Sequence, residues 1–95
     1  MKRFEYSQEK NALVKKQHGI SFEEVIDALE SKKVLAAFPH PNHVKYPNQM
    51  MMVIEVKGYA YVVPTVEEED FIFLKTAFPS RKYAKKYLKL RKEHI

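Results

Sequence analysis

The sequence predicts an α+β fold, with a mostly antiparallel sheet of about four strands, two N-terminal helices and one basic C-terminal helix. Two observations along the chain support this class. Apolar residues recur at helical spacing near the N-terminus, and strand-like apolar runs then fill the middle before a basic helical segment closes the chain. With 95 residues, the chain is long enough for one domain and too short for two, so we expect residues 1–95 to form a single domain.

A short strand and a first helix are expected at the start. Residues Phe4–Tyr6 alternate briefly between polar and apolar and suit an edge strand. Ser7 follows as the expected N-cap of a helix that runs to about His18. Gly19 then suits the left-handed position just past a helix end.

The second helix has the sharpest local signature. Ser21 and Glu24 form a capping box, in which the first residue caps the helix and the other returns the hydrogen bond. Apolar residues then recur on one face of a helix predicted from Phe22 to about Ser31. They are Phe22, Val25, Ile26 and Leu29.

After this helix the pattern changes from helical to extended. The loop expected at Pro39–Asn48 contains three prolines. A turn at Lys57-Gly58 and an acidic turn at Glu67–Asp70 separate the later strands, and Pro64 is expected to end or edge the strand before the acidic turn. The predicted strands are Val34–Phe38, Gln49–Val56, Tyr59–Val63 and Phe71–Ala77.

The C-terminal end is strongly basic. Ser80 is the expected N-cap of the last helix, and the net charge of the chain is +5. Such an end attracts polyanions or an acidic partner, although a solvated helix face explains the same charges. The basic residues are Lys75, Arg81, Lys82, Lys85, Lys86, Lys89, Arg91 and Lys92.

Several classes of protein are disfavoured, because the sequence lacks the residues or segments that they need. There is no cysteine, which excludes disulfides and thiolate metal sites. The pair His40 and His43 has no third metal ligand at a telling distance, so neither a metal nor another cofactor is expected. The start has no apolar signal region, and the longest apolar run, Met50–Ile54, is too short to span a bilayer. We therefore expect a cytoplasmic protein that makes no membrane contact.

Two stretches resemble a known family. The segment Phe4-Glu5-Tyr6…Glu9-Lys10-Asn11…Lys16…His18-Gly19-Ile20-Ser21-Phe22-Glu23-Glu24 is similar to the N-terminal signature of BrnT-type toxins. The segment Phe73-Leu74-Lys75…Pro79-Ser80-Arg81-Lys82…Lys86-Tyr87 resembles their closing strand and basic helix. The middle, around His40-Pro41-Asn42, Tyr46-Pro47-Asn48-Gln49 and Met50–Met52, departs from the pattern of the best-known members and indicates a divergent branch.

The resemblance implies a RelE-like toxin of a toxin–antitoxin system. It further implies a ribonuclease that blocks translation by cleaving RNA, with the ribosome as a further candidate partner. The partner that would silence it is an acidic antitoxin with a ribbon–helix–helix DNA-binding part.

Metal-independent RNA cleavage sets the chemistry to look for. The 2′-hydroxyl attacks the adjacent phosphate, which requires a base, an acid and fixed positive charge. Arginine matches phosphate geometry, and an imidazole, which titrates near pH ~6.5, serves either proton role. The catalytic candidates are Arg81, Lys75, His43 and His40.

Each catalytic candidate has a simpler structural explanation. Arg81 is the first choice for the phosphate, because it opens the last helix and matches the closing motif, yet it is also an ordinary surface arginine. Lys75 ends the preceding strand, where an exposed lysine is equally expected. His40 and His43 lie on a loop, where either is a candidate acid or base or an ordinary loop histidine.

RNA contact is expected from lysines and tyrosines near these groups. Tyrosine rings stack on bases, although the spacing of Tyr83 and Tyr87 also suits core packing. The same charges fit a non-catalytic basic binder, or a harmless partner of an acidic protein. The RNA-binding candidates are Lys45, Tyr46, Lys82, Tyr83, Lys86 and Tyr87.

Overall fold

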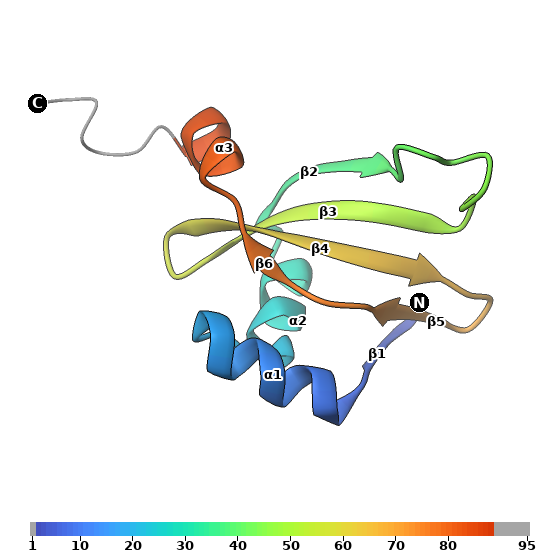
Figure 1. Ribbon diagram of the computed structural model, residues 1–95, viewed down its shortest axis with the longest axis horizontal. Coiled ribbons are helices and arrows are strands. Elements are labelled where there is room, and N and C mark those ends of the chain that lie inside the picture. The colour runs from blue at the N-terminus through green and yellow to red at the C-terminus, as the bar shows by residue number, and fades with distance from the viewer. Residues whose placement is uncertain (1, 89–95) are drawn as a thin grey trace, which may run out of the picture.

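Six strands form one mixed sheet in the computed structural model, which describes residues 2–88 (Figure 1). The last helix begins as α3 and continues as a π-helical turn, η1. In chain order the elements are β1 (Arg3–Tyr6), α1 (Gln8–His18), α2 (Phe22–Glu30), β2 (Val34–Pro39), β3 (Gln49–Val56), β4 (Tyr59–Glu67), β5 (Phe71–Leu74), β6 (Phe78–Pro79), α3 (Arg81–Tyr83) and η1 (Ala84–Leu88).

The order of the strands confirms the α+β class. The main path is β1-β5-β4-β3-β2, and β6 pairs with β4 beside that path. Only β1, at one edge, runs parallel to its neighbour, while the described pairs among β2 to β6 are antiparallel. The sheet has more strands than the expected four or so, because β1 joins it and because β6, which was not expected, pairs with β4. The strand predicted at Phe71–Ala77 ends at Leu74.

Pro64 lies where the pairing along β4 passes from β5 to β6. It does not end β4 as expected but lies inside it, opposite Met51, and β4 continues to Glu67. The Pro64 carbonyl accepts a hydrogen bond from the Lys75 N–H at 3.0 Å. The amide and carbonyl of one residue point to the same neighbour in an antiparallel pair, so the N–H that proline lacks faces the gap between β5 and β6.

The helices cover the two faces of the sheet differently. α1 and α2 pack on one face, which we call the helical face, around buried Val14, Phe22, Val25, Ile54 and Leu74. α3 and η1 pack on the opposite face, around Val53, Ala60, Val62 and Ala84. Figure 1 shows α3 on the other side of the sheet from α1 and α2.

The ends of α1 and α2 follow the sequence prediction. The Ser7 hydroxyl accepts a hydrogen bond from the Lys10 N–H at 3.1 Å, and Gly19 closes α1 with a φ of 74°. Ser21 and Glu24 form both hydrogen bonds of the capping box. Lys89, Arg91 and Lys92, which were expected to continue the basic helix, lie outside the described residues.

One buried side chain connects these N-terminal elements. Asn11 is only 5% exposed. Its Oδ1 accepts the Phe22 N–H at 2.7 Å, and its Nδ2 donates to Glu23 Oε1 at 3.2 Å. Glu23 Oε2 accepts the Tyr6 hydroxyl at 3.0 Å, so a chain of three side chains ties β1, α1 and α2 together.

Replacing Asn11 with alanine should destabilise the fold. The change leaves the Phe22 N–H without a partner at a buried site, which costs about 2 kcal/mol in the free energy of unfolding. We expect the urea midpoint to fall by about 1 M. Gln17→Ala, an exposed change in the same helix, is the control. Equal midpoints for both variants would show that the Asn11 bonds contribute nothing.

The same network should make stability depend on pH through Glu23. Its own backbone N–H, the Tyr6 hydroxyl and the Asn11 carboxamide lower the pKa of the Glu23 carboxyl. A lowered pKa in the folded state adds stability above the ordinary carboxyl pKa of about 4.3, and this stability is lost as the pH falls through the lowered value.

Urea midpoints at neutral pH and near pH 3 measure this effect. The loss of stability on acidification should be smaller in Glu23→Gln than in the unchanged protein, because the amide has no proton to take up. Glu9→Gln, an exposed change in α1, should leave the loss unchanged. An identical acid response in all three proteins contradicts the assignment.

Candidate functional site

Aromatic side chains follow one face of the edge strand β2. Ala36 and Phe38 contact the core on the face opposite α1 and α2. His40 is the next residue in this alternation, and its N–H still pairs with the Gln49 carbonyl at 3.1 Å. Two residues along a strand span about 6.6 Å, so Phe38 and His40 are neighbours on the same face.

The loop after β2 folds back onto His40. The Tyr46 N–H donates to the Asn42 carbonyl at 2.9 Å, and the Lys45 N–H donates to Asn42 Oδ1 at 3.3 Å. This turn brings the rings of Tyr46 and His40 to 4.7 Å between centroids. Lys45 Nζ lies 5.4 Å from the centre of the Tyr46 ring. An imidazole, a phenol and an ammonium group therefore gather at this end of β2.

The hydrogen bonding of His40 defines which ring nitrogen is available. Nδ1 accepts the Asn42 N–H at 2.9 Å. In the neutral imidazole the proton then resides on Nε2, because Nδ1 is the acceptor. Nε2 is accordingly a hydrogen-bond donor toward a bound molecule, and the lone pair that can accept a proton is the one on Nδ1, which the Asn42 N–H occupies.

The other end of the aromatic row comes from the last helix. The Ser80 hydroxyl caps this helix by accepting the Tyr83 N–H at 3.2 Å. The rings of Tyr83 and Tyr87, four residues apart, stack with 5.8 Å between centroids and an interplanar angle of 25°. Tyr83 also meets Phe38 across the elements, at 6.0 Å. The helix thus extends the row that β2 begins.

A lysine accompanies each tyrosine of the row. Lys82 Nζ lies 5.3 Å from the centre of the Tyr83 ring, and Lys86 Nζ lies 5.3 Å from that of Tyr87. The five rings are half-buried, whereas the three lysines are exposed. We call this array the tyrosine–lysine ladder. It consists of Tyr87, Tyr83, Phe38, His40 and Tyr46 with Lys86, Lys82 and Lys45.

The ladder joins all six residues for which the sequence suggested RNA contact. Tyr83 and Tyr87 also pack against the core of this face, as their spacing indicated. Phe38 was missed as a site residue, although its ring meets that of Tyr83 at 6.0 Å. The signal for it was the strand alternation that places Phe38 and His40 on one face.

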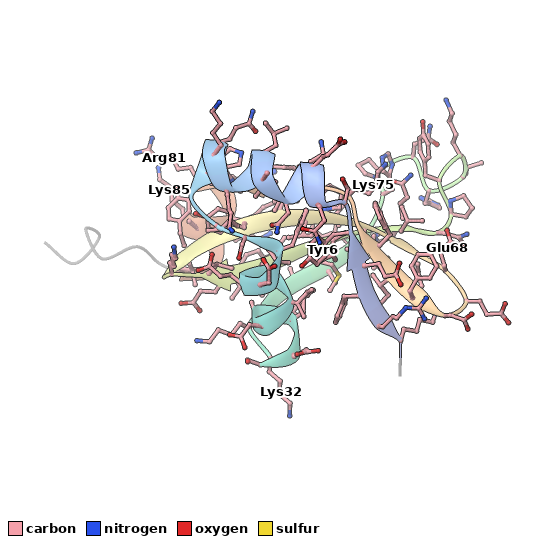
Figure 2. All side chains as sticks on the ribbon, turned by 90° about the horizontal axis from the view of Figure 1, so that it is seen from below. Tyr6, Lys32, Glu68, Lys75, Arg81 and Lys85 are labelled. Atoms are coloured by element: carbon pink, nitrogen blue, oxygen red, sulfur yellow. The ribbon has the colours of Figure 1, made fainter. Side chains whose placement is uncertain are left out.

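The four catalytic candidates are not brought together. Arg81 is exposed at the start of α3, whereas His40 and His43 lie on the loop at the other end of the sheet (Figure 1). Lys75 directly follows β5, which lies three strands from β2, about 14 Å across a sheet. Figure 2 shows Lys75 well separated from Arg81 along the molecule.

In the part of the chain that the structure describes, none of the three best-formed cavities is lined by any of these four residues. The best-formed cavity there, of about 310 Å³, lies between α2 and the β3–β4 turn and includes Glu24 and Glu55. Two others, of about 360 and 730 Å³, lie on the helical face around Phe4 and Leu29. The ladder is therefore an open surface feature and not a pocket.

Residues 2–88 contain neither a candidate metal site nor a membrane-spanning helix. Within this range, no group of three or more His, Asp or Glu side chains is arranged to hold a metal ion. None of the helices described there has the length and hydropathy needed to cross a bilayer.

Comparisons with known proteins identify no family. No protein-family model matches the sequence, and no curated protein is significantly similar to it. The resemblance to BrnT-type toxins therefore stays a prediction, and the function is argued from the ladder and its surroundings.

Proposed function

We propose that the chain is a metal-independent endoribonuclease toxin that inhibits translation by cleaving RNA. The observation that carries the proposal is the position of His40, beside Tyr46 and Lys45 and at one end of the ladder. A group able to transfer protons thus lies next to rings and cations of the kind that bind single-stranded RNA. The resemblance in the first and last segments supports the toxin class.

The proposed reaction is an internal transesterification. The 2′-oxygen loses its proton and bonds to phosphorus, and the bond from phosphorus to the 5′-oxygen breaks as that oxygen takes up a proton. The products are a 2′,3′-cyclic phosphate and a free 5′-hydroxyl. In this proposal the neutral His40 ring takes the 2′-hydroxyl proton on Nδ1, in exchange for the hydrogen bond from the Asn42 N–H, and then gives that proton to the 5′-oxygen. The Lys45 ammonium offsets the charge that grows on the phosphate.

The remaining candidates take other places in this proposal. Arg81 lies at the helix end of the ladder, so we assign it to the RNA backbone away from the bond that breaks. Lys75 directly follows β5, and we place it on the ladder's face because Leu74 before it packs into the core of the helical face. His43, exposed at the tip of the loop, has no role in the reaction.

An acidic antitoxin with a ribbon–helix–helix part completes the proposal. The net charge of +5 favours an acidic partner over a basic one. The ribosome, which is rich in RNA, is the further candidate partner. The DNA-binding part of the antitoxin follows from the resemblance alone.

A second candidate function is a non-catalytic basic binder of nucleic acid or of a protein target. One observation favours it: Arg81 starts α3 and His40 lies at the loop after β2, at the other end of the sheet, so the full set of groups expected for cleavage does not converge. The two functions differ in their product, which is shortened RNA in the first case and intact, bound RNA in the second.

Replacing His40 with glutamine should separate these functions. The amide occupies a similar volume but transfers no proton, so the cleavage rate should fall by about 100-fold or more. The assay is gel analysis of a labelled single-stranded RNA, with and without ribosomes. His43→Gln is the matched control and should cleave like the unchanged protein. Intact RNA with the unchanged protein, under both conditions, would support the binder.

Expression in cells should test the toxin class. The unchanged protein should arrest growth, and His40→Gln should relieve the arrest at equal protein level. Co-expression of an acidic antitoxin encoded beside the chain should also relieve it. Harmless high-level expression of the unchanged protein would instead favour a stability partner that is never toxic.

A further inference from the structure

We propose that the tyrosine–lysine ladder binds an unpaired nucleic-acid strand by base stacking, and that it accepts RNA and DNA alike. This inference rests on the proposed function only in placing nucleic acid on this face. It names the form of the strand and does not require that the strand be cut.

The ring spacing suits successive bases. The centroid distances are 5.8 Å from Tyr87 to Tyr83, 6.0 Å from Tyr83 to Phe38 and 4.7 Å from His40 to Tyr46. Stacking on such rings tolerates any base, because every base has a π-face. The row follows the edge strand β2 from α3 to the loop, so a bound strand would run along this edge.

The lysines supply one cation beside each tyrosine. Lys82 and Lys86 lie over the rings of Tyr83 and Tyr87 and are exposed, so their side chains rotate freely. A base that stacks on a ring would displace the ammonium group. The displaced group then meets the phosphate of the same nucleotide and exchanges a cation–π contact for an ion pair. Each step therefore offers a ring for the base and a charge for the backbone.

The geometry selects unpaired strands over duplexes. The rings are half-buried, so a base must turn its face outward to stack on the exposed part of a ring. Bases inside a duplex are already stacked and present only their edges. Stacking and phosphate contacts do not involve the 2′-hydroxyl, so DNA should bind as well as RNA.

Fluorescence anisotropy with uncleavable strands tests the inference. The probes are a labelled oligothymidine, a 2′-O-methyl RNA of matched sequence and the corresponding DNA duplex. The two single strands should bind with similar affinity, and the duplex should bind more weakly. Equal binding of the duplex, or binding of the RNA alone, would overturn the inference.

Matched variants distinguish stacking from general attraction. Tyr46→Leu removes a ring outside the described core clusters, so folding is not at risk. It should weaken binding by about 5- to 100-fold, the measured range for one stacked base. Phe71→Leu, an aromatic residue with Arg3 over its ring but outside the ladder, should leave binding unchanged.

Salt dependence gives the matching test for charge. Lys82→Gln should reduce the slope of log affinity against log salt by about 0.7, the value for one phosphate contact on a single strand. Lys16→Gln removes the same charge from α1 on the helical face and should leave the slope unchanged. Equal effects of the two changes on the slope would show that Lys82 makes no specific phosphate contact, and would overturn the charge role of the ladder.

The two proposals can fail separately. If the unchanged protein binds both single strands through the ladder but cuts no RNA, the ribonuclease proposal fails and the ladder inference holds. If RNA is cut while Tyr46→Leu and Lys82→Gln bind like the unchanged protein, the ladder inference fails.

Discussion

The buried carboxamide of Asn11 sets the arrangement of the N-terminal half. A helix start leaves N–H groups without partners inside the helix, and the capping box of α2 satisfies the one on Glu24. The N–H of Phe22 remains, at a residue with no exposed surface, and Asn11 is what satisfies it. Because Glu23 extends the same chain of bonds to Tyr6, α1, α2 and β1 are held as one unit.

Holding both helices on one face has a consequence for the other face. α1 and α2 share their core with the helical face of β3 and β4, so α3 and η1 are the described helical elements on the opposite side. Ala84, which has no exposed surface, lets this short helix approach Val53 and Val62 closely. The tyrosines beside Ala84 are thereby carried to the edge of the sheet, where Phe38 meets them. The ladder thus depends on the fact that α1 and α2 cover one face of the sheet, whereas α3 and η1 pack on the other.

Local signals predicted more of the fold than of the site. The caps of α1 and α2, the edge strand β1 and the turn at Lys57-Gly58, whose φ angles of 54° and 77° suit a tight hairpin, depend on neighbouring residues. β4 continues through Pro64 because the missing N–H falls where no neighbouring strand needs it. Which neighbour each amide faces is not visible in the sequence, so this continuation could not be predicted. Likewise, the sequence could not show whether the residues of the N-terminal signature serve a site or the packing of the fold. Residues that carry a family resemblance, Tyr6 and Asn11 among them, serve the packing of helices here.

The site required distances between elements that are remote in sequence. Lys45 and Tyr46 lie beside His40 in the chain, so their proximity was foreseeable from one loop. The contact of Phe38 with Tyr83 joins residues 45 positions apart, and no periodic pattern specifies it. Convergence of Arg81 with the loop histidines was expected for the same chemistry, yet the length of β2 keeps the two ends of the ladder apart.

Packing alone explains part of the ladder but not its composition. Leucine at Tyr83 or Tyr87 would fill the same space against the core, and neither position needs a cation. The chain has six tyrosines. Those in the ladder each follow a lysine directly, whereas Tyr6, Tyr59 and Tyr61 follow glutamate, glycine and alanine and serve the helical face. Arg3 also lies over the Phe71 ring, but from two residues of different strands. A lysine directly before a tyrosine and over its ring recurs along the ladder, and this repeat supplies the ring and the charge that a strand of bases and phosphates requires.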